Sequence, residues 1–364
     1  MALTNPAVLL RDAGEWTANQ TVIDSWGLPS KTPAQLGLNR VATSVGSAIW
    51  TKHPAFTGRK NVLERLRQVI LWQADDNESE WYPQGITTHY DAVGGPALAG
   101  KKWVVTSAYH DESDTKGARV TFVDTTTPTS ATYNYRHVLL VEPTAPNSFR
   151  RVPIHAGGLA WYGKYLYVAT TSVGFLVFDT TQMKQVSTDD KTKIGRVGTK
   201  YYGLGYEYVL PLVGRYVMAG TKMKFSYCAI DRGQTPHRIL AGEYDTSAHA
   251  QLRWWNLDAA TGRLAMNGGL AAPVLERGTG ADERIQGAVS WNSASPTSNV
   301  WLCSSELSEG ELFRRPRDGG PGKSYNSWAL SGEDLSYDAD AGLLWSLTED
   351  DGKRSIFAVR IADV

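Results

Sequence analysis

Short apolar runs separated by Gly- and Asp-rich turns occupy the chain from residue 81 onward, and one strand pattern recurs there. Each recurrence begins with a strand-like head and turns into a second apolar strand that ends in small polar residues. In most cases a third strand follows. Meanders of this kind cannot bury an apolar face alone, so they stack radially on their neighbours. The heads read PQGITT at 83, IHAGGLAW at 154, YYGLGYEY at 201, IQGAVSW at 285 and EDLSYD at 333.

This repetition predicts an all-β fold, and specifically a β-propeller with five blades. Phrases such as FDTT and NLDAATG provide the Asp-led turns at which the backbone reverses between strands. Residues 215–231 could contain an additional hairpin, so a sixth blade is left open.

The first eighty residues follow a different pattern. We interpret residues 1–80 as an N-terminal helical collar on a propeller formed by residues 81–364. Thr32 and Pro33, followed by Gln35, supply the capping residues of a helix start. A second short helix is predicted where five apolar residues share one helical face, namely Val62, Leu63, Leu66, Val69 and Ile70.

Closure of the ring needs a strand from outside the repeats. The last repeat ends after three strands, and a free sheet edge would favour aggregation. Residues 46–52, GSAIWTK, have the pattern of a strand and are proposed to close the ring. The alternative, that this segment is a loop of the collar, stays open.

Composition narrows the classes of partner. Lys plus Arg and Asp plus Glu are balanced at 37 each and no dense basic run occurs, which argues against a nucleic-acid or anionic-membrane partner. No apolar run approaches the roughly 18 residues of a membrane span, and residues 1–16 lack a signal-peptide pattern. We expect a monomer that binds a small molecule or a glycan.

The two cysteines leave the cellular compartment open. Cys228 and Cys303 both fall in strand-like runs, where cysteine usually behaves as a small buried hydrophobe. A disulfide between them is an open alternative, and two cysteines cannot by themselves form a four-ligand structural zinc site.

The strand heads carry the candidate chemistry. In a propeller the first strand begins and the second strand ends at the same mouth of the central channel, so both sets of side chains converge on one funnel. A concave site with a few polar groups is the usual form of a ligand site. The heads contribute Gln84, His155, Tyr202, Gln286, Glu333 and Asp334, and the second strands contribute Tyr109, His110, Thr171, Glu243, Tyr244, Ser305, Glu306 and Glu349.

An acid–base pair is the catalytic hypothesis. His155 with Glu333 or Glu243 could exchange protons with a substrate, because imidazole titrates near neutral pH and a nearby carboxylate orients it. Tyr202 or Tyr109 could donate a hydrogen bond to developing negative charge. The plain alternative is that polar heads bind water and backbone groups and hold the ring together. The ligand-binding candidates are Gln84, Tyr109, His110, Gln286, Asp334 and Glu349.

No cofactor is required by the sequence, and calcium is the one candidate. Glu333, Glu243, Glu349 and backbone carbonyls could supply the roughly six to eight oxygens that calcium takes, although no clustered Asp loop supports such a site.

Two further expectations concern the histidine and tryptophan side chains. His89 and His110 lie beside carboxylates in the segments HYD and HDESD and are expected to be solvated. Tryptophans at strand positions are expected to pack between blades. Trp254 and Trp255 are adjacent and point to opposite faces of a strand, so one of them is expected to meet solvent or a ligand.

The segments WYPQGITT, HAGGLAWYGKYLYVA, YRHVLLVEP and EDLSY resemble those of a group of secreted actinobacterial β-propeller proteins, over nearly the whole chain. This resemblance implies an extracellular location and supplies no catalytic residue. More distantly, the QG and EDL heads resemble strand openings of gluconolactonases and strictosidine synthase, in which a Glu or Asn lines the central mouth. The heads of this chain are two Gln, one Tyr, one His and one Glu, and this set departs from that pattern.

We therefore expect an extracellular hydrolase, lyase or cyclase that acts on a glycan or small natural product in the central funnel. The alternative is a non-catalytic β-propeller that binds a glycan or a partner. The heads differ from one another, which favours a single axial site over one pocket per blade.

Overall fold

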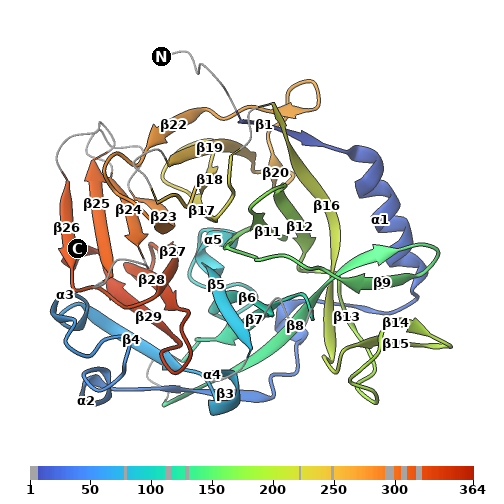
Figure 1. Cartoon of the computed structure of the whole chain (residues 1–364). Coiled ribbons are helices and arrows are strands. Elements are labelled where there is room, and N and C mark those ends of the chain that lie inside the picture. Colours follow the sequence, from blue (N-terminus) through green and yellow to red (C-terminus); the bar gives the residue numbers. More distant parts are fainter. Residues whose placement is uncertain are drawn as a thin grey trace.

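The fold is described by a computed structural model that covers residues 7–77, 80–110, 116–127, 131–220, 223–246, 250–291, 299–304, 310–316 and 322–364. Strands dominate these residues, so the predicted all-β fold is confirmed. Antiparallel sheets of the propeller type surround a central axis (Figure 1).

A closed ring of inner strands surrounds that axis. Each inner strand packs beside the next, and the last packs beside the first. Four of the five begin within the predicted heads or directly beside them. The inner strands are β5 (Trp81–Thr88), β10 (Gly158–Tyr162), β17 (Tyr227–Asp231), β23 (Ile285–Trp291) and β27 (Gly332–Asp338).

Each inner strand opens an antiparallel meander that runs outward. After β5 the first meander continues through β6 (Trp103–His110), β7 (Ala118–Asp124) and β8 (Thr132–Thr144), and after β10 the second continues through β11 (Tyr165–Thr170), β12 (Gly174–Asp179) and β16 (Tyr208–Gly220). After β17 the third meander continues through β18 (Arg238–Gly242), β19 (Gln251–Asp258) and β22 (Leu275–Gly278). After β23 the fourth continues through β24 (Asn299–Ser304), β25 (Glu311–Pro316) and β26 (Lys323–Asn326). The fifth continues through β28 (Leu343–Thr348) and β29 (Ser355–Arg360), and its outer strand is β4 (Leu66–Leu71).

Strand β4 therefore closes the ring, and this corrects two expectations. The segment predicted as one helix forms a single turn, α3 (Lys60–Leu63), and then β4, because Val69 and Ile70 are β-branched and their backbone pairs with β29. Residues 46–52, proposed as the closing strand, contain the short helix α2 (Ser47–Trp50) instead.

The remaining helices and short strands lie outside the five meanders. Thr32 and Gln35 form the expected capping box, but the helix that follows is a single 3₁₀ turn. Among the described helices, none has the length and apolarity needed to cross a membrane. These elements are β1 (Ala7–Arg11), α1 (Ala13–Ser25), β2 (Ser30–Lys31), β3 (Arg40–Ser44), α4 (Ala74–Asn77), α5 (His89–Val93), β9 (Ser148–Arg151), β13 (Met183–Gln185), β14 (Ile194–Val197), β15 (Lys200–Gly203), β20 (Arg263–Leu264) and β21 (Leu270–Ala271).

Buried aromatic side chains fill the spaces between adjacent sheets. Phe122 of the first meander meets Trp161 of the second edge-on, with ring centroids 5.9 Å apart. Trp254 and Trp255 point to opposite faces of β19 as expected, but both are buried because each face is covered. The expectation that one of them meets solvent or a ligand is wrong.

Glycines let the inner strands approach one another closely at the axis. A Cβ on Gly85 would lie 2.7 Å from the Leu159 nitrogen, and one on Gly287 would lie 2.7 Å from the Cα of Asp334. A Cβ on Gly158 would overlap the backbone nitrogen of Cys228. The glycines of the QG and HAGG heads therefore serve strand-to-strand packing around a narrow centre.

Asp334 fills part of the space that these glycines leave. Its Oδ2 accepts hydrogen bonds from the backbone N–H groups of Ile86 (3.2 Å) and Leu159 (3.0 Å), so one side chain of β27 ties β5 and β10 together. Burial raises the pKa of Asp334 well above its ordinary value. The axis is thus occupied at this level by a strand-bridging carboxyl group.

This role predicts a difference between two substitutions. Asp334→Ala leaves two buried N–H groups without an acceptor and should lower the free energy of unfolding by about 2 kcal/mol. Asp334→Asn keeps an oxygen that can accept both hydrogen bonds and should cost less than about 1 kcal/mol. Urea unfolding at neutral pH measures both, and equal losses in the two variants would contradict the bridging role.

Candidate ligand-binding site

The ring brings most of the predicted head residues onto inner strands. Gln84 lies in β5, Gln286 in β23 and Glu333 in β27, and His155 lies just before β10. Tyr202 does not reach this position. It lies in β15, which forms a separate two-stranded sheet with β14. Its expected place at an inner-strand head is therefore wrong, and β17 is the third inner strand.

An aromatic stack stands at the mouth where the heads begin. The His155 ring stacks on Tyr109, with centroids 4.1 Å apart and planes inclined by 26°. Tyr109 stacks in turn on Tyr82 at 5.3 Å, and the Arg354 guanidinium lies 4.9 Å from the centre of the Tyr82 ring. His155 is exposed at the end of this stack. Two predicted residues, Tyr109 and His155, therefore do meet.

The predicted carboxylates of this mouth have separate partners. Glu349 accepts a hydrogen bond from the Gln84 amide at 2.6 Å. Both Glu243 carboxylate oxygens accept hydrogen bonds from backbone N–H groups, one from Lys224 (3.0 Å) and one from Gln251 (3.1 Å). The Glu243 side chain therefore holds these two backbone segments together. Glu333 is buried. Ser305 and Glu306 lie outside the described residues, and a catalytic pairing of His155 with Glu333 stays a prediction.

Two histidines expected in solvent are buried. His110 packs edge-on against Trp81 and forms an ion pair or hydrogen bond with Glu80 at 3.1 Å. His89 lies in α5, with its Nδ1 3.3 Å from the Trp103 backbone. No group of three or more His, Cys, Asp or Glu side chains is placed to hold a metal within the described part of the chain. Cys228 and Cys303 are free, buried thiols, which settles the open question of their pairing.

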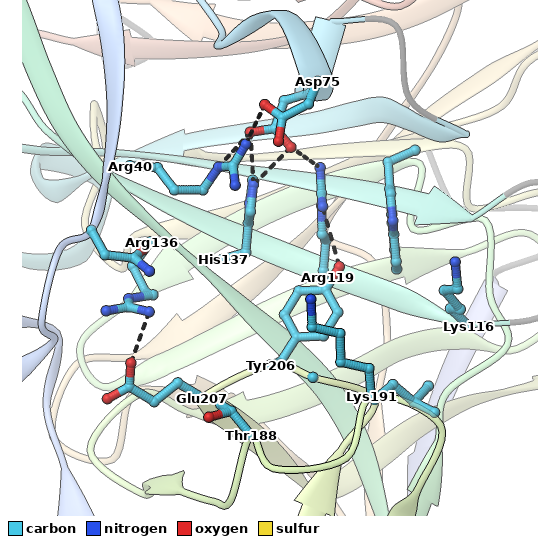
Figure 2. A pocket seen from close by; sticks show the side chains of 15 residues that line it. Arg40, Asp75, Lys116, Arg119, Arg136, His137, Thr188, Lys191, Tyr206 and Glu207 are labelled. Atoms are coloured by element: carbon cyan, nitrogen blue, oxygen red, sulfur yellow. Dashed lines mark hydrogen bonds and ion pairs between the residues drawn. The ribbon is translucent and has the colours of Figure 1, made fainter.

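A charged cavity of about 710 Å³ lies beside the first meander, and Figure 2 shows it from close by. Its walls come from the start of β3, helix α4, strands β5, β7 and β8, and the loops that flank the β14–β15 hairpin. Five of its side chains are basic and three are carboxylates. The lining includes Asn39, Arg40, Asp75, Asp76, Trp81, Lys116, Arg119, Arg136, His137, Thr188, Lys191, Tyr206 and Glu207.

Asp76 organises the back wall of this cavity. The buried carboxylate accepts hydrogen bonds from Arg40 Nε at 2.8 Å and from the Tyr135 hydroxyl at 2.5 Å. It also accepts from His137 Nε2 at 3.1 Å and from Arg119 Nη2 at 3.3 Å. Burial opposes ionisation, but the hydrogen bond from His137 and the charges around the group hold the pKa of Asp76 well below its usual range. Asp76 is therefore a fixed anion.

His137 is held in one uncharged form. Burial, and then the charge of Arg119, lower the pKa of His137 to about 4. Because Nε2 donates to Asp76, Nδ1 accepts from the Thr121 hydroxyl at 2.7 Å. Both ring nitrogens are thus occupied in the neutral imidazole, and this histidine has no nitrogen left for a substrate proton.

Neighbouring side chains and a backbone carbonyl hold Arg119 and Arg136 in fixed positions. Arg119 also donates to the Tyr206 hydroxyl at 3.1 Å and stacks 4.5 Å from the centre of the Trp81 ring. Arg136 pairs with Glu207 at 2.9 Å and donates to the Gly37 carbonyl. Side chains held this way lose little further freedom when a ligand binds.

The lining carries more positive than negative charge. With His137 neutral, five cations face three carboxylates, so two positive charges are in excess. Lys191 is exposed at the rim and forms no ion pair within the described residues, and in Figure 2 no dashed line reaches it. An anionic group is the ligand that this imbalance favours.

None of these cavity residues was predicted as a site. They come from segments far apart in the sequence, and Asp75-Asp76 reads as a solvated acidic helix turn. The one available signal is the alternation of charged residues in strand-like runs, as in ARVTF and YRHVLL, where a half-buried strand places Arg119 and His137 on one face.

Comparison with known proteins gives distant likenesses. No protein-family model and no curated protein matches the sequence. Among solved structures, hydrazine synthase of Kuenenia stuttgartiensis is 13% identical, with a TM-score of 0.34, over 72% of this chain and 61% of that one. The calcium-binding protein regucalcin of Agrobacterium tumefaciens is 13% identical, with a TM-score of 0.34, over 78% and 93%. A gluconolactonase of Xanthomonas campestris is 9% identical, with a TM-score of 0.33, over 91% and 97%. The distant likeness to gluconolactonases seen in the heads thus recurs among structures, at a level that carries no conclusion about activity.

Proposed function

We propose that this chain is a β-propeller, its five meanders being its five blades, that binds an anionic small molecule in the charged cavity. The observation that supports this most is the excess of basic side chains around about 710 Å³ of space. Pockets of this size hold typical small ligands. The extracellular location expected from the family resemblance fits such a role and stays an expectation.

An acidic saccharide is the class of ligand that fits the lining best. Carboxylate groups would meet Lys191 and the fixed arginines. Sugar hydroxyls would meet the uncharged polar groups Asn39, Thr188 and Tyr206. Arginine recognises carboxylates with two parallel hydrogen bonds, and its position here is set in advance by Asp76 and Glu207.

Binding is favoured over catalysis in this cavity. A general acid or base needs a proton that it can exchange near the working pH. Asp76 is a fixed anion and His137 is neutral with both nitrogens occupied, so neither side chain fits that role. The alternative is an acid–base enzyme at the mouth where the heads begin, with His155, Glu333 or Glu243 as catalytic residues, and no contact between His155 and either carboxylate favours it. Tyr202, the fourth catalytic candidate, lies away from that mouth in β15.

Titration calorimetry with a galacturonic acid trisaccharide tests the proposal, with the matching neutral galactose trisaccharide as the control ligand. We expect the acidic sugar to bind and the neutral one not to. Lys191→Gln should weaken binding about fivefold and Lys191→Glu more strongly, because a charge-assisted hydrogen bond is lost and then replaced by repulsion. Lys60→Gln is the matched control, since the Lys60 side chain is 82% exposed on α3, outside the cavity lining. Equal affinity for the two sugars, or unchanged affinity in Lys191→Glu, would overturn the proposal.

A further inference from the structure

A second cavity lies at the opposite mouth of the ring, where the inner strands end. It measures about 320 Å³ and is lined by residues that follow or end β5, β17, β23 and β27. Because the four strands belong to different meanders, this cavity lies on the central axis. It shares no lining residue with the charged cavity.

The walls of this axial cavity are largely apolar. Tyr90, Ile230, Tyr337 and Ala339 provide rings and aliphatic carbons. Ser290 adds one hydroxyl, whose oxygen already accepts a hydrogen bond from Trp254 Nε1 at 3.0 Å. A mostly apolar wall with few polar groups is typical of a site for a small organic ligand.

Arg232 brings a positive charge into this apolar setting. Its Nε and Nη2 donate to the Asp91 carbonyl at 3.0 and 2.7 Å, and Nη2 also donates to the Ala92 carbonyl at 2.8 Å. The guanidinium lies 4.8 Å from the centre of the Tyr162 ring. These contacts anchor the side chain on the last turn of α5 with carbonyl oxygens and a ring, and none of them is an ion pair.

These hydrogen bonds use Nε and Nη2 of the guanidinium and leave Nη1 unused. Nη1 lies next to Gly94, where a Cβ would stand 2.9 Å away, and it donates no hydrogen bond to the described residues. Arg232 is itself one of the residues that line the axial cavity. A fixed, partly desolvated arginine edge is a site for a carboxylate.

The nearest carboxyl group does not neutralise Arg232 directly. Asp91 Oδ2 accepts from the Thr87 hydroxyl at 2.8 Å and from the Ser336 hydroxyl at 2.7 Å, on the inner strands β5 and β27. Burial raises the pKa of Asp91 to about 6. The charged or titratable groups that act on Asp91 are Arg232, which follows β17, Cys228 of β17 and Asp334 of β27.

We propose that the axial cavity binds a small monocarboxylate with an aromatic or aliphatic body, whose carboxylate meets the Arg232 guanidinium and whose body lies against Tyr90 and Tyr337. The volume of about 320 Å³ leaves room for a molecule of the size of benzoate. This site is independent of the charged cavity, so either proposal can fail without the other.

Calorimetric titration with benzoate tests this site, with benzyl alcohol as the uncharged probe of the same shape. Benzoate should bind and benzyl alcohol should bind at least about tenfold more weakly, since it offers no partner for the cation. Affinity for benzoate should fall as the pH rises from 5 to 7.5, because Asp91 becomes ionised and repels the ligand. Equal affinity for the two probes would overturn the proposal.

Variants locate the bound benzoate. Ala339→Trp fills the cavity from an exposed rim position, so the fold should be kept while benzoate binding is lost. Arg232→Gln should weaken binding about tenfold, with exposed Arg360→Gln as its matched control. Lys191→Glu should leave benzoate binding unchanged. Unchanged affinity in Ala339→Trp, or loss of binding in Lys191→Glu, would place benzoate elsewhere and contradict the inference.

Discussion

Gly158→Ala should abolish the native ring or lower its free energy of unfolding by at least about 4 kcal/mol. A methyl group at this position would overlap the backbone nitrogen of Cys228 in the neighbouring inner strand β17. Neither backbone can move away, because each inner strand is packed between two others. Urea unfolding followed by tryptophan fluorescence measures the loss.

Gly95→Ala is the matched control for this substitution. No atom lies within 4 Å of a Cβ built on Gly95, so the same methyl group should change stability by less than about 1 kcal/mol there. If Gly158→Ala proved as stable as Gly95→Ala, the inner strands would have to be farther apart than the structure places them.

Asp76→Ala should lower the free energy of unfolding by about 3–5 kcal/mol, because it leaves Arg40 and Arg119 in a buried wall without their shared carboxylate. The effect should depend on pH with a definite sign. A carboxyl whose pKa is lowered by folding stabilises the protein above its ordinary pKa of 3.8, and this contribution is lost as the pH falls. The difference between wild type and variant should therefore shrink below about pH 4.

The neighbouring Asp75 provides the control. It lies on the same helix turn and pairs with the same Arg40, at 2.5 Å, but its side chain is 71% exposed. Asp75→Ala should cost no more than about 1 kcal/mol, as exposed ion pairs do. Thermal and urea unfolding of both variants between pH 3 and 7 would make the comparison, and equal losses would show that the Asp76 network is not buried as described.

The repeat pattern predicted the ring better than it predicted the chemistry. The heads at Gln84, His155, Gln286 and Glu333 mark inner strands or their starts because alternation and glycine spacing are properties of the local sequence. The third head was misassigned to Tyr202, because the β14–β15 hairpin has the same mixture of glycine and aromatic residues as a head. The strand β17 that replaces it follows directly after the long outer strand β16.

The two cavities could not be predicted in the same way. The heads suggested polar groups around an open funnel, but the spacing of strands at the axis, which leaves room for little beyond Asp334, depends on three-dimensional packing. Nothing in the local sequence around Asp76 and Asp91 marks either carboxyl as buried. Contacts with β7 and β8 lower the pKa of Asp76 against the effect of burial, whereas burial raises the pKa of Asp91.

Ring closure by β4 also sets an order of assembly during synthesis. The ribosome delivers Leu66–Leu71 early, but its partner β29 emerges only when the fifth meander is complete. Until then β4 can pair only with the end of β3, at Thr43–Leu71 and Ser44–Ile70, while β3 pairs with β8 of the first meander. Docking of β4 on β29 is therefore a late event that joins the first meander to the fifth, and a truncation beginning at residue 81 would leave β29 as a bare edge prone to intermolecular pairing.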